Sequence, residues 1–371
     1  MQNISASRTL AKRVLAAGSV AVLSAFAFAG CAASGSSSPS SGASGDIGVT
    51  LIVKTTTNPY FIAMEDAAKS AAAGSGVTLT LAAGKADGDE DTQVQAIENA
   101  ISRGDKGILI TPNGPSVIDA IAKARQAGLY VIALDTAPDP TSAVDVTFAT
   151  NNFAAGESIG KWTAAQLAGK PAVIAMLDLF NDKVVSVDVD RDQGFLTGMG
   201  IDLADKTKNG DEAPAGNYTG GKGGTYTIVG NQPTQGAEDG GRTAMETLLS
   251  KNPNINVVYT INEPAAAGAY QALKAAGIQD STLLVSIDGG CTGVSQVQQG
   301  IIGATAQQYP AKMAQLGVQA IAQLAKDGTK PTTSAGLDFF DTGSALVTDK
   351  PAAGLDSITS DAASKICWGT K

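Results

Sequence analysis

The stretch that decides the fold is residues 107–135, which read GILITPNGPSVIDAIAKARQAGLYVIALD. It contains two short apolar segments, 107–111 and 129–134, which are typical of buried strands. Between them, residues 117–126 place apolar side chains at helical spacing, and Gly128 follows as a helix stop. A strand, a helix and a second strand in this order predict a βαβ unit, whose two strands are parallel.

The same alternation of strands and helices continues on both sides of this unit, and it restarts near residue 150. The pattern therefore predicts an α/β fold made of two doubly wound parallel-sheet lobes. Residues 209–224 are rich in glycine and are expected to form a surface loop. The other predicted strands are 47–53, 77–81, 172–177, 225–229, 257–260, 283–287 and 303–306, and the other predicted helices are 61–74, 92–103, 156–167, 193–199, 240–250, 265–276 and 312–326.

The composition excludes several classes of function. The chain has 371 residues, of which 43% are hydrophobic, so it can bury a large core. It contains no histidine, which excludes Ser-His-Asp and Cys-His catalysis and the common histidine-based zinc sites. The 35 acidic residues outnumber the 26 basic ones, and an acidic chain repels phosphate backbones. We therefore expect no nucleic-acid partner, no cofactor and no metal.

The first 45 residues have the pattern of an export signal and a tether. Residues 1–30 contain no acid, and Arg8, Lys12 and Arg13 precede an apolar segment of signal-peptide length. The segment ends in small residues before Cys31, which resembles a bacterial lipobox and predicts a lipidated Cys31. Residues 31–45 are almost entirely Ser, Gly and Ala, a composition typical of a flexible tether. The alternative is ordinary secretion with an incidental cysteine.

Polar residues recur where the predicted strands end. In open parallel sheets the ligand crevice lies at the carboxyl ends of the strands. Carboxylates and amides at such ends can bind hydroxyl groups, and nearby aromatic rings can stack on the apolar face of a sugar. The alternative for each single residue is a helix N-cap or a solvated loop position. The strand-end residues are Lys54, Thr111, Asp135, Asn262 and Asp288, and the aromatic residues near them are Tyr60 and Phe61.

Six segments in this order resemble the periplasmic sugar-binding proteins of ribose type, which supply ABC importers. The resemblance covers residues from about 49 to about 347. It implies a type I periplasmic binding protein fold, in which three crossing segments join the lobes and the sugar lies between them. It places the N-terminal lobe at 46–149 plus 309–342 and the C-terminal lobe at 150–308 plus 343–371. The segments are Thr57-Asn58-Pro59-Tyr60-Phe61, Val131-Ile132-Ala133-Leu134-Asp135, Arg191-Asp192-Gln193-Gly194-Phe195, Ile261-Asn262-Glu263, Ser286-Ile287-Asp288-Gly289 and Gln307-Gln308-Tyr309-Pro310.

The resemblance also implies the ligand-binding residues. Arg191 and Asp288 would form charge-assisted hydrogen bonds to sugar hydroxyls. Tyr60 and Phe61 would offer stacking faces, and Lys54 would donate to a hydroxyl. The implied set is Lys54, Asn58, Tyr60, Phe61 and Asp135 in the first lobe, Arg191, Asn262 and Asp288 in the second, and Gln308 in a crossing segment.

Several positions favour a sugar other than ribose. Thr136 stands where ribose binders place an arginine, and Gly236 stands where they place a stacking aromatic residue. The closer likeness is to the fructose-binding branch, so we expect fructose or a similar ketose or hexose. We expect a monomeric, non-enzymatic receptor that delivers its sugar to an ABC permease with a separate ATPase. The segments that resemble that branch are Lys54-Thr55, Leu134-Asp135-Thr136-Ala137-Pro138, Asp288-Gly289-Gly290-Cys291, Leu346-Val347-Thr348-Asp349-Lys350-Pro351 and Cys367-Trp368-Gly369.

Two cysteines, Cys291 and Cys367, remain once Cys31 is assigned to the lipid. Outside the cytoplasm an even pair favours a disulfide, which would join the C-terminal tail to the loop after Asp288. The alternative is two buried thiols, because free cysteine packs like a small hydrophobic residue.

Other patterns have weaker interpretations. Residues 216–223 nearly match a phosphate-binding loop but lack its Ser/Thr, so a flexible loop explains them better. Asp188-x-Asp190-x-Asp192 opens like a calcium loop, although a solvated acidic turn fits better. Residues 87–91 are expected to cap the helix that starts near 92.

Two other functions stay open at this point. The first is a secreted glycoside hydrolase that uses Asp135 and Asp288 as acid and base. The second is a sugar-responsive regulator of similar fold, which the export signal and the absence of a basic DNA-binding module in the sequence disfavour.

Overall fold

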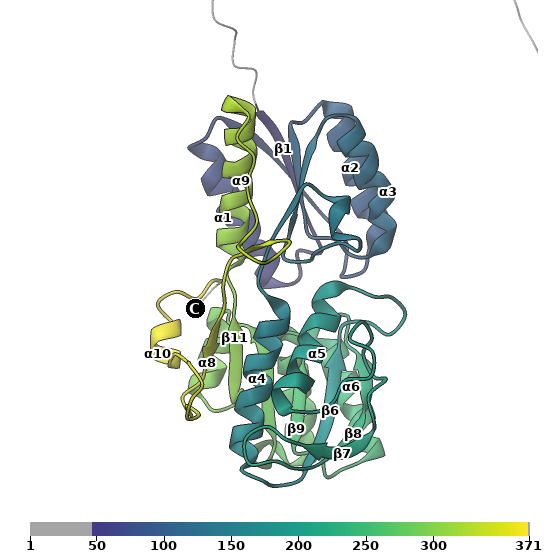
Figure 1. The fold of residues 1–371 in the computed structure, drawn as a ribbon, viewed down its shortest axis with the longest axis vertical. Helices are drawn as coiled ribbons and strands as arrows, with labels where there is room; N and C mark the ends of the chain where they lie inside the picture. The colour runs from purple at the N-terminus through teal and green to yellow at the C-terminus, as the bar shows by residue number, and fades with distance from the viewer. Residues whose placement is uncertain (1–46, 370–371) are drawn as a thin grey trace, which may run out of the picture. The chain divides into compact units, whose positions relative to one another are not determined.

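The computed structural model describes residues 47–369, which form two β-sheets of mainly parallel strands, each with helices on both faces (Figure 1). The first sheet has six strands in the order β12-β5-β4-β3-β1-β2, and the second has seven in the order β13-β11-β10-β9-β6-β8-β7. The predicted α/β architecture of two doubly wound lobes is therefore confirmed. The predicted signal peptide, the tether and Cys31 lie outside the described residues.

The first lobe is built from the N-terminal part of the chain and one late helix and strand. All its strand pairs are parallel. Helices α1 and α9 cover one face of the sheet, and α2 and α3 cover the other (Figure 1). Its strands are β1 (Ile47–Val53), β2 (Val77–Ala83), β3 (Gly107–Ile110), β4 (Tyr130–Leu134), β5 (Val146–Ala149) and β12 (Phe340–Asp341), and its helices are α1 (Pro59–Ala73), α2 (Glu90–Arg103), α3 (Ile118–Gln126) and α9 (Pro310–Asp327).

The second lobe repeats this plan with antiparallel strands, β7 and β13, at its two edges. Helices α4 and α5 pack on one face of the sheet, and α6, α7 and α8 pack on the other. Its strands are β6 (Ala172–Asp178), β7 (Ala215–Tyr218), β8 (Gly224–Pro233), β9 (Val257–Thr260), β10 (Leu283–Asp288), β11 (Ala304–Gln307) and β13 (Ala345–Val347), and its helices are α4 (Asn152–Leu167), α5 (Ser186–Met199), α6 (Glu238–Lys251), α7 (Glu263–Ala276), α8 (Cys291–Gln298) and α10 (Ser360–Ala363).

The chain passes between the two sheets at three places. It leaves the first sheet after β5, returns to it after β11 and crosses again after β12. These short crossings bring the carboxyl ends of the strands in both sheets toward one another, so residues distant in sequence can share one site.

Close packing of α4 on α5 fixes the position of Arg191. A Cβ added at Gly156 on α4 would overlap the backbone carbonyl of Arg191 on α5. Only glycine permits this backbone approach, because any side chain would separate the helices.

The structure differs from the predicted elements at several places. Helix α5 begins at Ser186 rather than 193, because buried acids such as Asp188 and Asp192 interrupt the apolar periodicity of its first turns. Strand β7 lies within the predicted surface loop, and its exposed edge position leaves no apolar pattern to detect. Among the described helices, none is long and apolar enough to cross a membrane.

Candidate ligand-binding site

All nine predicted ligand-binding side chains line one small cavity between the two sheets. The cavity has a volume of about 30 Å³ and is also lined by Asp87 and by the apolar residues Leu179, Val187 and Ile261. The side chains come from strand ends, from helix starts and from one crossing segment, as the arrangement of parallel sheets requires. The nine residues are Lys54, Asn58, Tyr60, Phe61, Asp135, Arg191, Asn262, Asp288 and Gln308.

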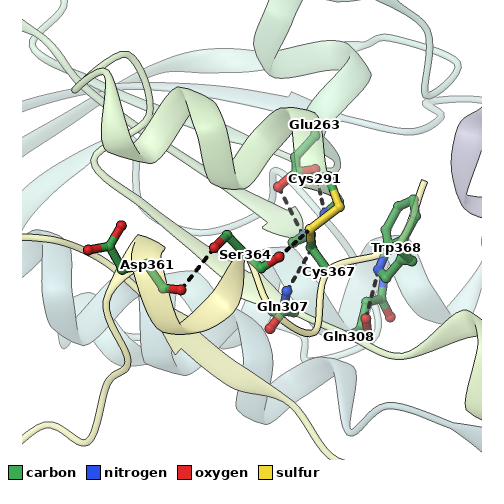
Figure 2. The surroundings of a disulfide bond; sticks show 10 residues. Glu263, Cys291, Gln307, Gln308, Asp361, Ser364, Cys367 and Trp368 are labelled. Carbon is green, nitrogen blue, oxygen red and sulfur yellow. Dashed lines mark hydrogen bonds between the residues drawn. A yellow bond between two sulfur atoms is a disulfide. The ribbon is translucent and has the colours of Figure 1, made fainter. Parts of the chain in front are cut away.

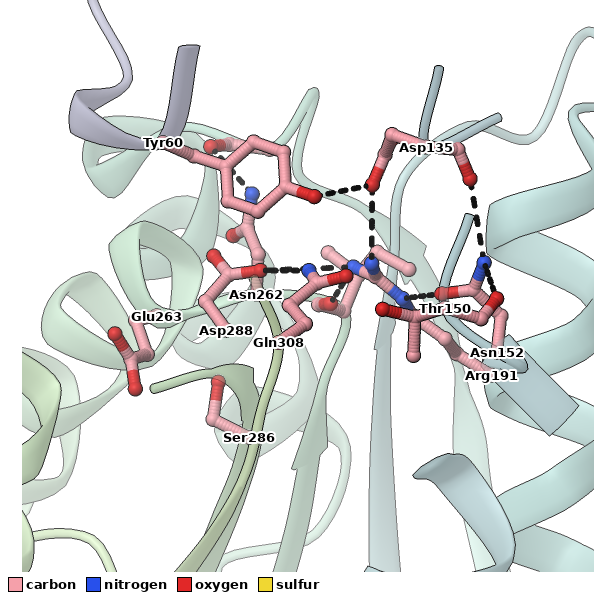
Figure 3. A network of polar contacts seen from close by, with 12 residues as sticks. Tyr60, Asp135, Thr150, Asn152, Arg191, Asn262, Glu263, Ser286, Asp288 and Gln308 are labelled. Carbon is pink, nitrogen blue, oxygen red and sulfur yellow. Dashed lines mark hydrogen bonds and ion pairs between the residues drawn. The ribbon is translucent and has the colours of Figure 1, made fainter. Parts of the chain in front are cut away.

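Arg191 lines this cavity and lies between two carboxylates (Figure 3). Its side chain is 5% exposed. Its Nη2 lies 3.8 Å from Asp135 Oδ1, and its Nη1 lies 3.9 Å from Asp288 Oδ1. The guanidinium is held by two hydrogen bonds, from Nε to Asn152 Oδ1 at 2.8 Å and from Nη1 to the Ile261 carbonyl at 3.0 Å. Both ion pairs are longer than a hydrogen bond, so guanidinium N–H groups stay able to donate to a ligand.

Asp135 follows β4 and is oriented by two hydroxyl donors. Tyr60 donates to Oδ1 at 2.8 Å (Figure 3), and Thr136 donates to Oδ2 at the same distance. Burial, followed by the neighbouring Asp135 charge, raises the pKa of Tyr60 well above its usual value, so this hydroxyl keeps its proton. The hydroxyl of Tyr60 therefore has a positioning role that the expectation of a stacking face did not include.

Asp288 ends β10 and faces the cavity from the second lobe. Its Oδ1 accepts a hydrogen bond from Gln308 Nε2 at 2.8 Å, and its Oδ2 has no partner among the described residues. Burial raises the pKa of Asp288 to about 7, and Arg191 opposes this shift. A protonation near neutral pH lets this group both donate to and accept from a ligand hydroxyl.

The two carboxylates also share an unusual backbone conformation. Asp135 has φ of 64° and Asp288 has φ of 143°, both in the region that L-residues rarely adopt. Such strain persists only where surrounding structure enforces it, and it clusters at ligand clamps and switches. Both strand ends therefore have a positive φ that the surrounding structure must hold in place.

The two asparagines of the predicted set act as helix caps as well. Asn58 Oδ1 accepts from the Tyr60 backbone at the start of α1, and Asn262 Oδ1 accepts from Ala265 at the start of α7. The Nδ2 of Asn262 also donates to the Gly236 carbonyl at 3.0 Å. The helix-cap alternative is therefore correct for Asn262, and Asn58 acts as a cap that the sequence analysis did not predict, although both residues also line the cavity.

Asp87 is a cavity residue that the sequence interpretation assigned to a helix cap. Asp89 is the residue that caps α2, since its Oδ1 accepts from the Thr92 backbone at 3.2 Å. Asp87 instead lines the cavity, where burial raises its pKa to about 6 and the Lys54 charge opposes the shift. The sequence does not show that Asp87, rather than Asp89 or Asp91, lines the cavity, because all three lie in one acidic segment.

Glu263 positions the turn that carries Asp288. Its carboxylate accepts hydrogen bonds from the Gly289 and Gly290 backbones at 2.9 and 3.0 Å, and from Thr305 at 2.9 Å. Burial and the Asp288 charge raise its pKa to about 8. The sequence pattern placed Glu263 next to a ligand residue without showing this role.

The predicted disulfide between Cys291 and Cys367 is confirmed, and the alternative of two free thiols is wrong (Figure 2). It holds Trp368 against the site: the Cys291 backbone donates to the Trp368 carbonyl, and Trp368 Nε1 donates to the Gln308 carbonyl, each at 2.9 Å. The Trp368 ring meets Tyr60 edge-on at 5.1 Å. The tail thus contacts two of the residues that line the cavity, Tyr60 and Gln308.

A second group of buried acids lies in the second lobe, around the start of α5. Asp188 accepts from the Leu179 and Phe180 backbones, and Asp192 is fully buried. The expected solvated acidic turn is therefore wrong, because these residues lie in a buried helical segment. Within residues 47–369, no cluster of acids or cysteines could hold a metal ion.

Because of these buried acids, we expect the free energy of unfolding to depend on pH, and we expect Asp178→Asn to weaken that dependence. Burial and the Asp188 charge raise the pKa of Asp178 to about 8. Its carboxyl is then protonated when folded and ionised when unfolded at neutral pH, so the free energy of unfolding falls as pH rises from about 4 to about 8. In Asp178→Asn, we expect the slope of the free energy of unfolding against pH to become less steep by up to about 1.4 kcal/mol per pH unit.

Urea denaturation at several pH values between 5 and 8 measures this effect. The matched control is Asp280→Asn, which changes an exposed acid of the same lobe. An unchanged pH slope in Asp178→Asn would contradict the assignment.

The fold and the cavity define a class of protein: a two-lobed α/β receptor that holds a small polar ligand at the carboxyl ends of its parallel strands. Residues 47–330 match the model of the periplasmic binding protein domain family, so the chain belongs to this family. The predicted type I periplasmic binding protein fold is thereby confirmed.

Similarity to characterised relatives extends over most of the chain. The ribose import binding protein RbsB of Haemophilus influenzae is 27% identical over 280 residues, 75% of this chain and 86% of that protein. The galactofuranose-binding protein YtfQ of Escherichia coli is 28% identical over 272 residues, 71% of this chain and 77% of that protein. A carbohydrate transporter solute binding protein of Agrobacterium radiobacter, solved with D-arabinose, shares the fold with a TM-score of 0.69 at 22% identity, covering 83% and 96% of the two chains.

Proposed function

We propose that this protein is the exported sugar-binding component of an ABC importer, which captures a monosaccharide between its two lobes. The observation that carries the proposal is the buried Arg191 between Asp135 and Asp288, in a cavity lined by all nine predicted residues. Charged hydrogen-bonding groups in a buried site select hydroxylated ligands, because a ligand without hydroxyls leaves them unpaired. The relatives named for ribose and galactofuranose support a sugar as ligand.

Binding requires the lobes to separate and close. A cavity of about 30 Å³ holds only one or two water molecules, which is too little for a sugar. The lobes touch through Lys183 and Glu90 at 2.9 Å, and through Ser186 Oγ, which donates to the Ala137 carbonyl at 2.7 Å. We infer a hinge motion that opens these contacts, with closure driven by the ligand's preference for the closed form.

We propose fructose or a similar ketose or hexose as the sugar. Gly236 has φ of 63°, and a Cβ there would lie 3.0 Å from Asn262 Nδ2 and from Asp87 Oδ2. Glycine therefore keeps space beside the cavity that an aromatic side chain would occupy. Thr136 donates its hydroxyl to Asp135 Oδ2, where ribose binders place an arginine, so Arg191 is the arginine that lies beside this carboxylate.

The location and partners follow from the same proposal. A lipid on Cys31 and the tether 31–45 would hold a monomeric receptor at the outer side of the membrane. The closed form would dock on a permease driven by a separate ATPase. Mass spectrometry of the membrane fraction tests the lipid, and Cys31→Ala should release the protein from it.

Titration calorimetry with D-fructose, D-ribose, D-allose and D-tagatose tests the function. We expect micromolar binding of at least one sugar, with D-fructose among the tightest, and the sugar recovered unchanged by chromatography. Absence of binding by every sugar would overturn the proposal. Release of hydrolysis products from glycosides would instead support the alternative in which Asp135 and Asp288 act as acid and base.

A further inference from the structure

A second and larger cavity adjoins the first at the mouth between the lobes. Its volume is about 410 Å³, within the range of about 300–1,000 Å³ typical of small-molecule sites. It shares Asn58, Asp87 and Asp288 with the first cavity, so the two spaces adjoin at these side chains. Its apolar lining consists of Pro59, Ala86, Ala237, Pro264, Ala267 and Trp368.

A buried hydrogen-bond acceptor, Asp288 Oδ2, lies between the two cavities and has no partner among the described residues. Asp288 is 3% exposed, and its Oδ2 makes no hydrogen bond to any described residue. An unpaired buried carboxylate oxygen is costly, so this atom calls for a donor from the ligand. Because Asp288 lines both spaces, a ligand group bonded to it can extend from the first cavity into the second.

The charges of the second cavity restrict what it accepts. The described residues that line it include no lysine or arginine, whereas they include Asp87, Glu238, Glu263 and Asp288. An anionic group such as a phosphate or a carboxylate would therefore find no cation to pair with in this lining. Thr57, Gln235 and Gln296 offer neutral hydrogen-bonding groups beside the apolar lining, which is the mixture that a sugar ring prefers.

The indole of Trp368 is a fixed part of this lining. The disulfide at Cys367 and the hydrogen bond from Nε1 to the Gln308 carbonyl hold it in place (Figure 2). A rigid aromatic side chain costs little conformational entropy when it contacts a ligand, and it offers that ligand a large apolar surface.

We propose that the second cavity accepts a neutral sugar unit linked to the monosaccharide in the first cavity, so that the protein binds a disaccharide as well as the free sugar. This inference rests on the proposed function, because the first sugar unit occupies the site around Arg191. The accepted disaccharide is the one whose glycosidic oxygen lies beside Asp288, so that its second sugar unit extends toward Trp368.

A scan of linkages tests this directly. Sucrose, trehalulose, turanose, maltulose, leucrose and isomaltulose each contain glucose joined to fructose and differ in the fructose hydroxyl that carries it. We expect one or two of them to bind with an affinity within about tenfold of that for D-fructose. The others should bind about 100-fold or more weakly, because their glucose unit would clash with the residues that line the first cavity. If another sugar of the panel binds best, its own glucosides replace these.

The possible failures are distinguishable. Absence of binding by every free sugar overturns the proposed function itself. Tight binding of the free sugar with a loss of more than about 100-fold for every disaccharide overturns the extended site and leaves the proposed function standing.

A filling variant locates the second sugar unit. Ala267 lines the second cavity but not the first, so Ala267→Phe should leave the affinity for the free sugar within about twofold and weaken the accepted disaccharide about tenfold or more. The matched control is Ala275→Phe, at an exposed position of the same helix α7, which should change neither affinity.

If Ala267→Phe does not fold, Thr292→Tyr fills the same cavity from α8, where Thr292 is exposed. Equal weakening of both ligands, or no weakening of the disaccharide by a folded filling variant, would overturn the assignment.

Discussion

Arg191→Ala is expected to abolish high-affinity sugar binding and to destabilise the fold. The change removes the cation between Asp135 and Asp288, both of which are buried. Uncompensated buried carboxylates cost about 3–5 kcal/mol, so the free energy of unfolding should fall by that amount. Loss of a charged hydrogen bond to the ligand should weaken binding by at least about 1.5 kcal/mol, or more than tenfold. Calorimetry and urea denaturation measure the two effects.

Two further variants separate binding from stability. Arg242→Ala removes an exposed arginine of α6 that pairs with Glu246 at 2.8 Å, and it should change stability by less than about 1 kcal/mol and leave binding intact. Asp288→Asn keeps the shape of the site and removes one acceptor charge, so it should weaken binding even if Arg191→Ala does not fold. Wild-type affinity in folded variants of both Arg191 and Asp288 would remove the site assignment.

Removal of the disulfide, by the double change Cys291→Ser and Cys367→Ser, is expected to give the second large effect. The bond joins residues separated by 76 positions and so restricts the unfolded chain. The free energy of unfolding should fall by about 2–4 kcal/mol. Sugar affinity should fall severalfold, because Trp368 then packs on Tyr60 and Gln308 without its covalent tether.

Reduction of the wild-type protein is the control for the stability effect of the Cys291–Cys367 disulfide. Wild-type protein in dithiothreitol should unfold at the urea concentration at which the double variant unfolds, while the variant should not respond to dithiothreitol. A wild-type midpoint that does not change on reduction would show that the bond contributes nothing to stability.

Much of the fold could be predicted because its signals are local. The strand–helix–strand pattern of residues 107–135 needs only apolar periodicity and glycine stops, and β3, α3 and β4 lie within it. Short edge strands such as β12 and β13 lack such a pattern, because they pair at the rim of a sheet with partners distant in sequence. The start of α5 was missed since its buried acids hide its apolar face.

The sequence allowed us to predict which residues line the cavity, but not what each of their side chains contacts. Strand ends and family-like segments identified nine of the lining residues, since parallel sheets bring such ends together. The bond from Tyr60 to Asp135, the support from Trp368 and the inward position of Asp87 depend on side-chain contacts between distant segments. A single sequence contains no local signal for such contacts, as the assignment of Asp87 to a helix cap shows.

The most direct test of the central claim is a crystal structure of the protein grown with the sugar that binds tightest in the calorimetric panel. The account predicts a single sugar ring between the two sheets, with hydroxyl oxygens within hydrogen-bonding distance of Arg191, Asp135 and Asp288. A sugar bound elsewhere on the molecule, with these three side chains left without ligand contacts, would contradict it.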